Sequence, residues 1–175
     1  IDTLGNALDF GNLTVSRYSI GALASPTKIF GGGGNASSTY YSLIETITTS
    51  SKGNAIDDGD LGNELTEAAA ASNSVRGIWA GGSTLFLSDI QYRTLSSSGN
   101  AIYFGDLTVG RRSVGSGAST QIRMVIGGGR TPTILNTIDF VTIASAGNAQ
   151  DFGDLTEPRR GMGGLSDSHG GLGGY

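Results

Sequence analysis

A three-residue phrase, Gly-Asn-Ala, recurs four times along this chain at nearly constant intervals. The copies begin at Gly5, Gly53, Gly99 and Gly147, which gives steps of 48, 46 and 48 residues. Each copy opens a longer shared phrase, as in GNAIYFGDLT and GNAQDFGDLT. Self-similarity at a fixed period indicates one supersecondary unit repeated in an array, and periods of about 40 to 50 residues are typical of propeller blades. The period therefore predicts a single repeat array over residues 1–175.

The amino-acid composition indicates that the repeated unit is built of β-strands. Glycine supplies 30 of the 175 residues and charged residues only 15%; glycine and β-branched residues are poor helix formers. The net charge is −4, and no basic cluster exceeds the pairs Arg111-Arg112 and Arg159-Arg160, so nucleic-acid binding is not expected. Apolar stretches such as residues 122–126 are too short to cross a bilayer, so no membrane insertion is expected either. The absence of cysteine excludes disulfides and thiolate metal sites.

The third repeat contains four short strand patterns separated by turns. Residues 112–119 are small and polar, 122–126 are apolar and lead into a glycine run, 138–143 alternate, and 150–155 close the unit. Gly-Asn suits the turn before the last strand because both residues tolerate positive φ. The predicted unit is a four-stranded antiparallel sheet. The one helix-compatible run, 64–71, aligns with an inner strand and is expected to adopt that conformation.

Two aromatic positions keep a constant offset within the repeats. Tyr92 precedes Phe104 by twelve residues, and Phe140 precedes Phe152 by twelve. Rings on adjacent strands of a hairpin can pack edge to face, so we expect a ring pair in each of these repeats. An earlier repeat has Asp58 at the second position, and we expect a looser junction there.

This order of strands resembles kelch repeats. Their pattern is an Arg-led strand, an apolar strand ending in a glycine doublet, a strand with an aromatic residue and an aromatic closing strand, here Arg112, 122–128, Phe140 and Phe152. The chain departs from that pattern where a Trp would follow closely, since its second aromatic residue is a Phe beyond the turn. The wording GNA-x-D-F-G-D-L-T-x-x-R is similar to the kelch-like repeats in structural proteins of tailed bacteriophages, marine ones especially. The resemblance covers essentially the whole chain.

The strand patterns predict an all-β β-propeller with about 3.5 repeats of four-stranded blades, and the resemblance implies that it is kelch-like. The chain supplies a last strand at 8–13, three full blades, and two opening strands of a fourth at 159–165 and 168–173. The fourth blade then lacks a strand, and proteins usually avoid the unpaired edge that this leaves. A larger ring or a partner chain accounts for the count, and a four-bladed ring with one deficient blade is the alternative. The expected partners are other virion proteins or copies of the same chain.

The Asp-rich phrases at 9–12, 57–60 and 151–154 raise the possibility of calcium sites. Asp beside Gly is ordinary turn chemistry, and the EF-hand spacing with its terminal Glu is absent, so no metal site is predicted. The single histidine, His169, follows Ser168 without a nucleophile elbow, so no catalytic residue is predicted. The glycine runs precede neither a helix nor a Lys-Ser/Thr pair, so they are interpreted as close backbone approaches rather than phosphate or cofactor sites.

The loops that follow the glycine runs share no wording, although the surrounding phrases repeat. These loops are residues 35–41, 83–87 and 130–135. Binding is usually carried by variable loops on a rigid scaffold. Tyr40, Tyr41 and Phe86 are therefore candidate binding residues, since aromatic rings can stack on sugar rings. The alternative interpretation is that a neighbouring blade covers them.

The resemblance implies a structural protein of a bacteriophage virion. We expect a non-enzymatic tail-fibre or decoration component in the virion that presents loops for assembly or host attachment, with a host-surface glycan as a candidate ligand and no cofactor. The alternative is an extracellular or cell-surface propeller that binds carbohydrate, an adhesin. A third class, a propeller enzyme of the sialidase or oxidase kind, would require titratable residues that converge on the axis.

Overall fold

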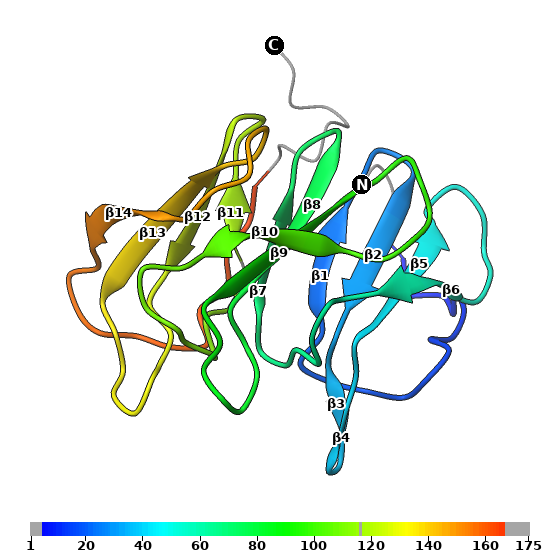
Figure 1. Cartoon of the computed structure of the whole chain (residues 1–175). Coiled ribbons are helices and arrows are strands. Elements are labelled where there is room, and N and C mark those ends of the chain that lie inside the picture. Colours follow the sequence, from blue (N-terminus) through cyan, green and yellow to red (C-terminus); the bar gives the residue numbers. More distant parts are fainter. Residues whose placement is uncertain (1–4, 116, 167–175) are drawn as a thin grey trace.

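The computed structural model describes residues 5–115 and 117–166, which form three four-stranded antiparallel sheets in succession (Figure 1). The first sheet has the order β1 (Gly21–Ala24), β2 (Lys28–Gly32), β5 (Leu43–Thr48) and β6 (Ile56–Asp60). The second sheet has the order β7 (Ala69–Ser72), β8 (Arg76–Ala80), β9 (Asp89–Thr94) and β10 (Ile102–Asp106). The third has the order β11 (Ala118–Ser119), β12 (Arg123–Gly127), β13 (Thr137–Thr142) and β14 (Gln150–Asp154). A small hairpin is made of β3 (Asn35–Ala36) and β4 (Thr39–Tyr40).

The described residues contain no helix, which confirms the predicted all-β class and the four-stranded unit. The inner strand β11 is shorter than the predicted 112–119. The strands predicted at 8–13 and 159–165 are wrong, because among the described residues neither segment has a neighbouring strand to complete a ladder. The strand predicted at 168–173 lies outside the described residues.

The inner strands of the three sheets lie next to one another near the middle of the molecule. β1 contacts β7, and β7 contacts β11 (Figure 1). They are built from small residues, and all four residues of Ala69–Ser72 are buried. Small side chains are required because β7 has another sheet on each side. The helix-compatible run 64–71 therefore becomes a strand where it packs, as expected, since tertiary context overrides its helix propensity.

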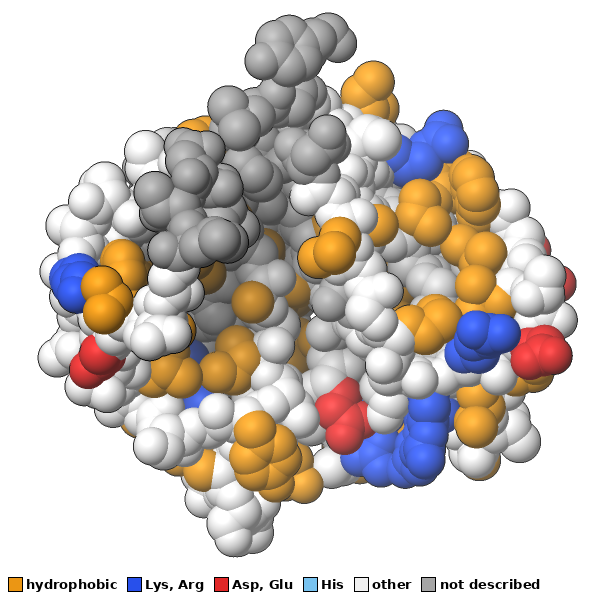
Figure 2. Space-filling model, turned by 180° about the vertical axis from the view of Figure 1, so that it is seen from behind, with side chains coloured by type: hydrophobic (Ala, Val, Ile, Leu, Met, Phe, Trp, Pro, Cys, Tyr) orange, Lys and Arg blue, Asp and Glu red, His pale blue; other side chains and the backbone are white. Residues whose placement is uncertain are grey.

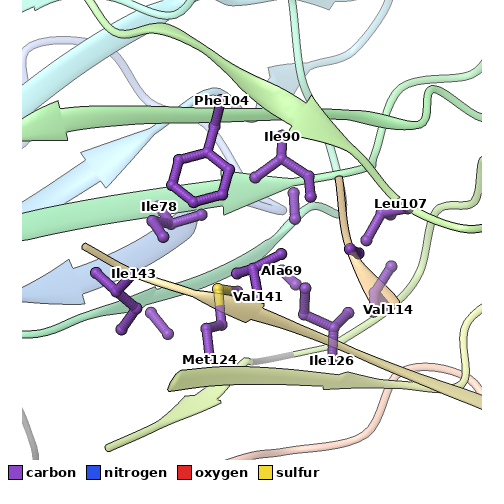
Figure 3. Packing of buried hydrophobic residues seen from close by; sticks show 13 residues of the cluster. Ala69, Ile78, Ile90, Phe104, Leu107, Val114, Met124, Ile126, Val141 and Ile143 are labelled. Carbon is purple, nitrogen blue, oxygen red and sulfur yellow. The ribbon is translucent and has the colours of Figure 1, made fainter. Parts of the chain in front are cut away.

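Side chains alternate between the two faces of the second sheet. In β8, Ile78 and Ala80 belong to the apolar cluster shared with the third sheet, while Trp79 belongs to the cluster shared with the first. Figure 3 shows the former cluster, in which Ile78 and Phe104 face Met124 across the junction. Each junction between sheets is thus a separate hydrophobic core.

Trp79 fills the junction between the first and second sheets. Its side chain is fully buried, and its indole Nε1–H donates a 2.8 Å hydrogen bond to the carbonyl of Gly21. A Cβ atom at Gly21 would lie 2.8 Å from the indole ring, and one at Gly32 would lie 2.6 Å from it. The first sheet therefore uses glycine at two positions to make room for the largest side chain of the second.

Each outer strand carries a β-bulge with one extra residue. In the first and second sheets this residue, Asp58 or Phe104, is buried in the junction with the following sheet. In β10 this residue is Phe104, which packs edge to face on Tyr92 with ring centroids 5.6 Å apart. In β14 it is Phe152, whose ring centroid lies 5.8 Å from that of Phe140 at an interplanar angle of 76°. Both predicted ring pairs are confirmed.

The bulge of β6 places Asp58 where the other repeats have a Phe. Asp58 forms a buried ion pair with Arg93 of the second sheet, with 3.1 Å between Oδ2 and Nη2. The Arg93 guanidinium in turn lies 5.3 Å from the ring centroid of Phe30. A charged cross-sheet contact thus occupies the junction that the sequence predicted to be looser.

The Gly-Asn-Ala turns hold neighbouring sheets together through the backbone. In every such contact, which we call a latch, the turn glycine N–H donates to a carbonyl of the preceding outer segment: Gly53 to Phe10, Gly99 to Asp58, and Gly147 to Phe104, at 2.8–3.0 Å. The turn asparagine Oδ1 accepts from the amide two residues further on in that segment: Asn54 from Asn12, Asn100 from Asp60, and Asn148 from Asp106. The repeated phrase is therefore the device that joins one repeat to the next.

Each latch depends on a glycine in the outer segment, which we call the cradle glycine. A Cβ atom at Gly11, Gly59 or Gly105 would lie 2.1–2.4 Å from the carbonyl oxygen of the turn glycine. These cradle glycines have φ between +125° and +159°, a region that other residues rarely adopt. Only glycine therefore allows the two backbones to approach so closely.

The Asp residues of the repeated phrase have a local structural role. Asp57 Oδ1 accepts a 3.0 Å hydrogen bond from the amide of Gly59, and Asp151 Oδ1 accepts a 2.8 Å bond from Gly153. This is the Asx-turn chemistry expected for Asp two residues before Gly. Among the described residues, no three Asp, Glu or His side chains are grouped so that they could hold a metal ion.

Candidate binding face

The three variable loops emerge from the same end of the sheets, at the lower edge of Figure 1. They differ in sequence and length, yet the same backbone hydrogen bond closes each of them. The residue that ends the loop donates its N–H to the second glycine of the doublet: Tyr41 to Gly34, Leu87 to Gly82, and Leu135 to Gly129, at 2.9–3.1 Å. The scaffold therefore fixes the base of each loop and leaves the intervening residues free to vary.

The glycine doublets bind each loop base to the segment that follows an outer strand. The amide of Gly82 donates to the Arg111 carbonyl, and the amide of Gly129 donates to the Arg159 carbonyl, both at 2.8 Å. A Cβ atom at Gly81 would lie 2.6 Å from the same Arg111 carbonyl. These contacts confirm the interpretation of the glycine runs as close backbone approaches, because the amides that a phosphate would need are already bonded to protein.

The predicted binding residues Tyr40, Tyr41 and Phe86 are half-buried on two neighbouring loops. The Arg17 guanidinium lies 5.9 Å from the centroid of the Tyr41 ring, and that of Arg112 lies 5.3 Å from the Phe86 ring. One ring of each loop is thus engaged by an arginine of the same chain. Tyr40 lies on the β4 hairpin, and among the described residues none of the three makes a ring pair with another.

A cavity of about 480 Å³ lies beside these loops, between the segments that lead into the inner strands. Equivalent residues of four successive repeats contribute to its lining: Ser19, Glu67, Ser113 and Gly161, all with φ between +52° and +63°. Backbone bonds connect them in pairs, since the Glu67 amide donates to Ser19 and the Gly161 amide to Ser113. The positive φ recurs with the repeat and has a structural role, although non-glycine residues bear a strain of about 1–3 kcal/mol each.

Glu67 supplies the carboxylate of this cavity. Its Oε2 accepts a hydrogen bond from the Ser113 hydroxyl and lies 4.0 Å from Nε of Arg112. Arg160 also lines the cavity. Figure 2 shows the molecule hollowed along its middle, with an acidic side chain beside a group of basic ones at the lower edge. Hydroxyls, a carboxylate and guanidinium groups around a hollow can orient a polar ligand.

Two buried ion pairs fix the segments between the outer strand of one repeat and the inner strand of the next. Arg111 Nη2 lies 2.5 Å from Asp139 Oδ2, and both side chains are fully buried. Thr108 donates to the same carboxylate through its amide at 3.0 Å and its hydroxyl at 2.6 Å. The first repeat has the equivalent pair Arg17–Glu45 at 2.9 Å. Burial lowers the pKa of Arg111, and the Asp139 charge opposes this shift.

The middle repeat has an uncharged version of this arrangement. Gly62 replaces the threonine, Leu65 replaces the arginine, and Gln91 replaces the acid. The amide of Gly62 donates a 2.6 Å hydrogen bond to Gln91 Oε1, and Leu65 is buried. Arginine and acid are thus lost together, which avoids an unpaired buried charge.

Sequence reasoning missed both the ion pairs and Glu67. A signal for the ion pairs was present, because Thr-x-x-Arg is followed by an acid in an apolar strand 28 residues after the arginine, at Glu45 and at Asp139. For Glu67 the sequence offered no such signal, since its place in the cavity depends on how three sheets come together.

The sequence matches no known protein family and no curated protein. No helix in the described part of the chain is long and apolar enough to cross a membrane. The function therefore has to be inferred from the chemistry of this face.

Proposed function

We propose that this chain is a non-enzymatic structural protein of a bacteriophage virion, a tail-fibre or decoration component. Its sheets are then blades of a kelch-like β-propeller that presents loops for assembly or attachment to the host surface. The observation that carries the proposal is the contrast between scaffold and loops: latches, doublets and ion pairs recur, whereas the loops that they fix diverge. Recognition is usually built in this way, by variable segments on a rigid scaffold.

The cavity supports a binding role over a catalytic one. Glu67 is the only carboxylate among its described lining residues. Glycoside hydrolysis ordinarily uses two carboxyl groups on opposite sides of the scissile bond, one as acid and one as base or nucleophile. The guanidinium groups of Arg112 and Arg160 are hydrogen-bond donors without an acceptor atom. These groups favour polar recognition, and the half-buried rings of Tyr40 and Phe86 favour a carbohydrate ligand.

We expect Tyr40→Ala and Phe86→Ala each to weaken binding to an array of bacterial surface glycans by about fivefold or more, as truncation of an aromatic anchor does. Tyr103→Ala is the matched control, because Tyr103 is 60% exposed on the outer strand β10 rather than on a loop. Its phenol donates to Asp106, a hydrogen bond that raises the pKa of Tyr103. Binding that all three variants retain would place recognition elsewhere, and release of a cleaved sugar would refute the non-enzymatic role.

A further inference from the structure

Four turns and four cradle glycines are present among the described residues, but only three latches are formed. The cradles at Gly11, Gly59 and Gly105 hold the turns that begin at Gly53, Gly99 and Gly147. The turn of residues 5–7 and the cradle at Gly153 remain. Among the described residues, nothing lies within 4 Å of a Cβ atom built at Gly153, although its φ of +131° is that of an occupied cradle.

The open cradle has the same local sequence as an occupied one. Residues 151–153 read Asp-Phe-Gly, as do residues 9–11, which hold a turn within this chain. The internal hydrogen bond is also already formed, since Asp151 Oδ1 accepts from the Gly153 amide as Asp9 Oδ1 does from Gly11. The backbone around Gly153 therefore already has the conformation that binds a Gly-Asn-Ala turn at the other cradles.

Two side chains around this cradle are also exposed where their counterparts in the second sheet are buried. Phe152 is 54% exposed, whereas Phe104 at the equivalent place in the second sheet is 3% exposed. The Arg159 side chain is 58% exposed and, among the described residues, its ion pair is with the nearby Glu157, whereas Arg111 is fully buried against Asp139. Among the described residues, the outer edge of the third sheet is thus an unpartnered copy of a surface that is covered in the first and second sheets.

We propose that a second copy of this chain docks here and seats its Gly5-Asn6-Ala7 turn on the cradle at Gly153. By analogy with the three latches, the amide of Gly5 donates to the Phe152 carbonyl, and Asn6 Oδ1 accepts from the amide of Asp154. The proposed contact between two copies has the same form as the three latches within one chain. It rests on the proposed structural role and names the partner in assembly.

The segment that follows the turn of residues 5–7 lies beside the first sheet, away from the cradle at Gly153. Phe10, three residues after Ala7, accepts a hydrogen bond from Gly53 beside the first sheet. In Figure 1, β6 and β14 lie at opposite sides of the view. Each copy therefore offers one turn at one end and one cradle at the other, a head-to-tail contact that generates rings or filaments.

Sedimentation over a range of concentrations, together with hydrogen exchange at the Asp154 amide, tests the proposal on the full chain. We expect association that protects the Asp154 amide as concentration rises. Asn6→Ala should raise the dissociation constant about two- to tenfold, which corresponds to one net hydrogen bond. Gly153→Ala should abolish association, because its Cβ would meet the incoming carbonyl as at the other cradles.

Asn100→Ala is the matched control, since it removes the same amide from a latch within the chain. It should lower the unfolding temperature and leave the dissociation constant unchanged. Asn6→Ala should raise the dissociation constant and leave the unfolding temperature of the monomer unchanged. A monomer whose Asp154 amide exchanges freely at all concentrations would overturn the proposal, and so would association that Asn6→Ala and Gly153→Ala leave intact. Protection of Asp154 in a monomer would show instead that the chain closes on its own turn. Glycan binding is read from a separate array, so the proposed ligand and the proposed partner can fail independently.

Discussion

Arg111→Leu should lower the free energy of unfolding by about 3–5 kcal/mol, because it leaves the Asp139 carboxylate buried without its cation. The threonine bonds to Asp139 remain but cannot neutralise the charge. Urea denaturation followed by the fluorescence of Trp79, the only tryptophan, measures the change. The neighbouring substitution Arg112→Leu is the control. Arg112 is partly exposed and 4.0 Å from its acid, so we expect a loss below about 1 kcal/mol.

The middle repeat shows how to restore the loss. The triple variant Thr108→Gly, Arg111→Leu and Asp139→Gln copies the uncharged set that this chain already contains as Gly62, Leu65 and Gln91. Because no buried charge is left unpaired, we expect stability within about 1.5 kcal/mol of the parent, as for other well-packed core replacements. A triple variant as unstable as Arg111→Leu alone would mean that charge balance does not explain the joint replacement.

Gly59→Ala should lower the free energy of unfolding by about 3–5 kcal/mol. Two effects combine: backbone strain at a φ of +125°, and a Cβ atom placed 2.4 Å from the Gly99 carbonyl oxygen. Relief of the clash moves the turn away and breaks the hydrogen bond from the Gly99 amide to Asp58. The same denaturation measurement applies.

Gly153→Ala separates these two effects. Its φ of +131° is nearly that of Gly59, but among the described residues nothing lies within 4 Å of the added Cβ. At low concentration, where copies do not associate, only the strain of about 1–3 kcal/mol is expected. Equal losses for the two variants would show that conformation alone, rather than the latch, requires glycine at these positions.

The strands and the ring pairs could be predicted from the sequence because both depend on local spacing. Alternation in residues 138–143 and the twelve-residue offset from Phe140 to Phe152 express the geometry of a single hairpin. The strands predicted at 8–13 and 159–165 could not be judged locally, since a strand exists only beside a partner. Both segments have the sequence of the repeat, but among the described residues neither forms the hydrogen bonds of a β-sheet.

The candidate site was predictable only in part. Divergence from one repeat to the next identified the loops that hold Tyr40 and Phe86, because loss of the repeat is visible in the sequence. The arginines that lie over Tyr41 and Phe86 could not be predicted from the sequence, because they come from segments ahead of the inner strands. Such contacts depend on how neighbouring sheets close around the middle, and hydrophobic periodicity does not encode this.

The charged and uncharged junction sets have a consequence for how such an array can change its length. The Thr-x-x-Arg motif directly follows one sheet, while its carboxylate lies in the sheet that comes next, as with Arg111 and Asp139. Recombination between a charged and an uncharged repeat would therefore combine an arginine with a glutamine, or a leucine with an acid, and bury a lone charge. The charged and the uncharged set therefore cannot exchange single members without loss of stability. Duplication or loss of repeats is tolerated only where the break points keep each arginine with its acid.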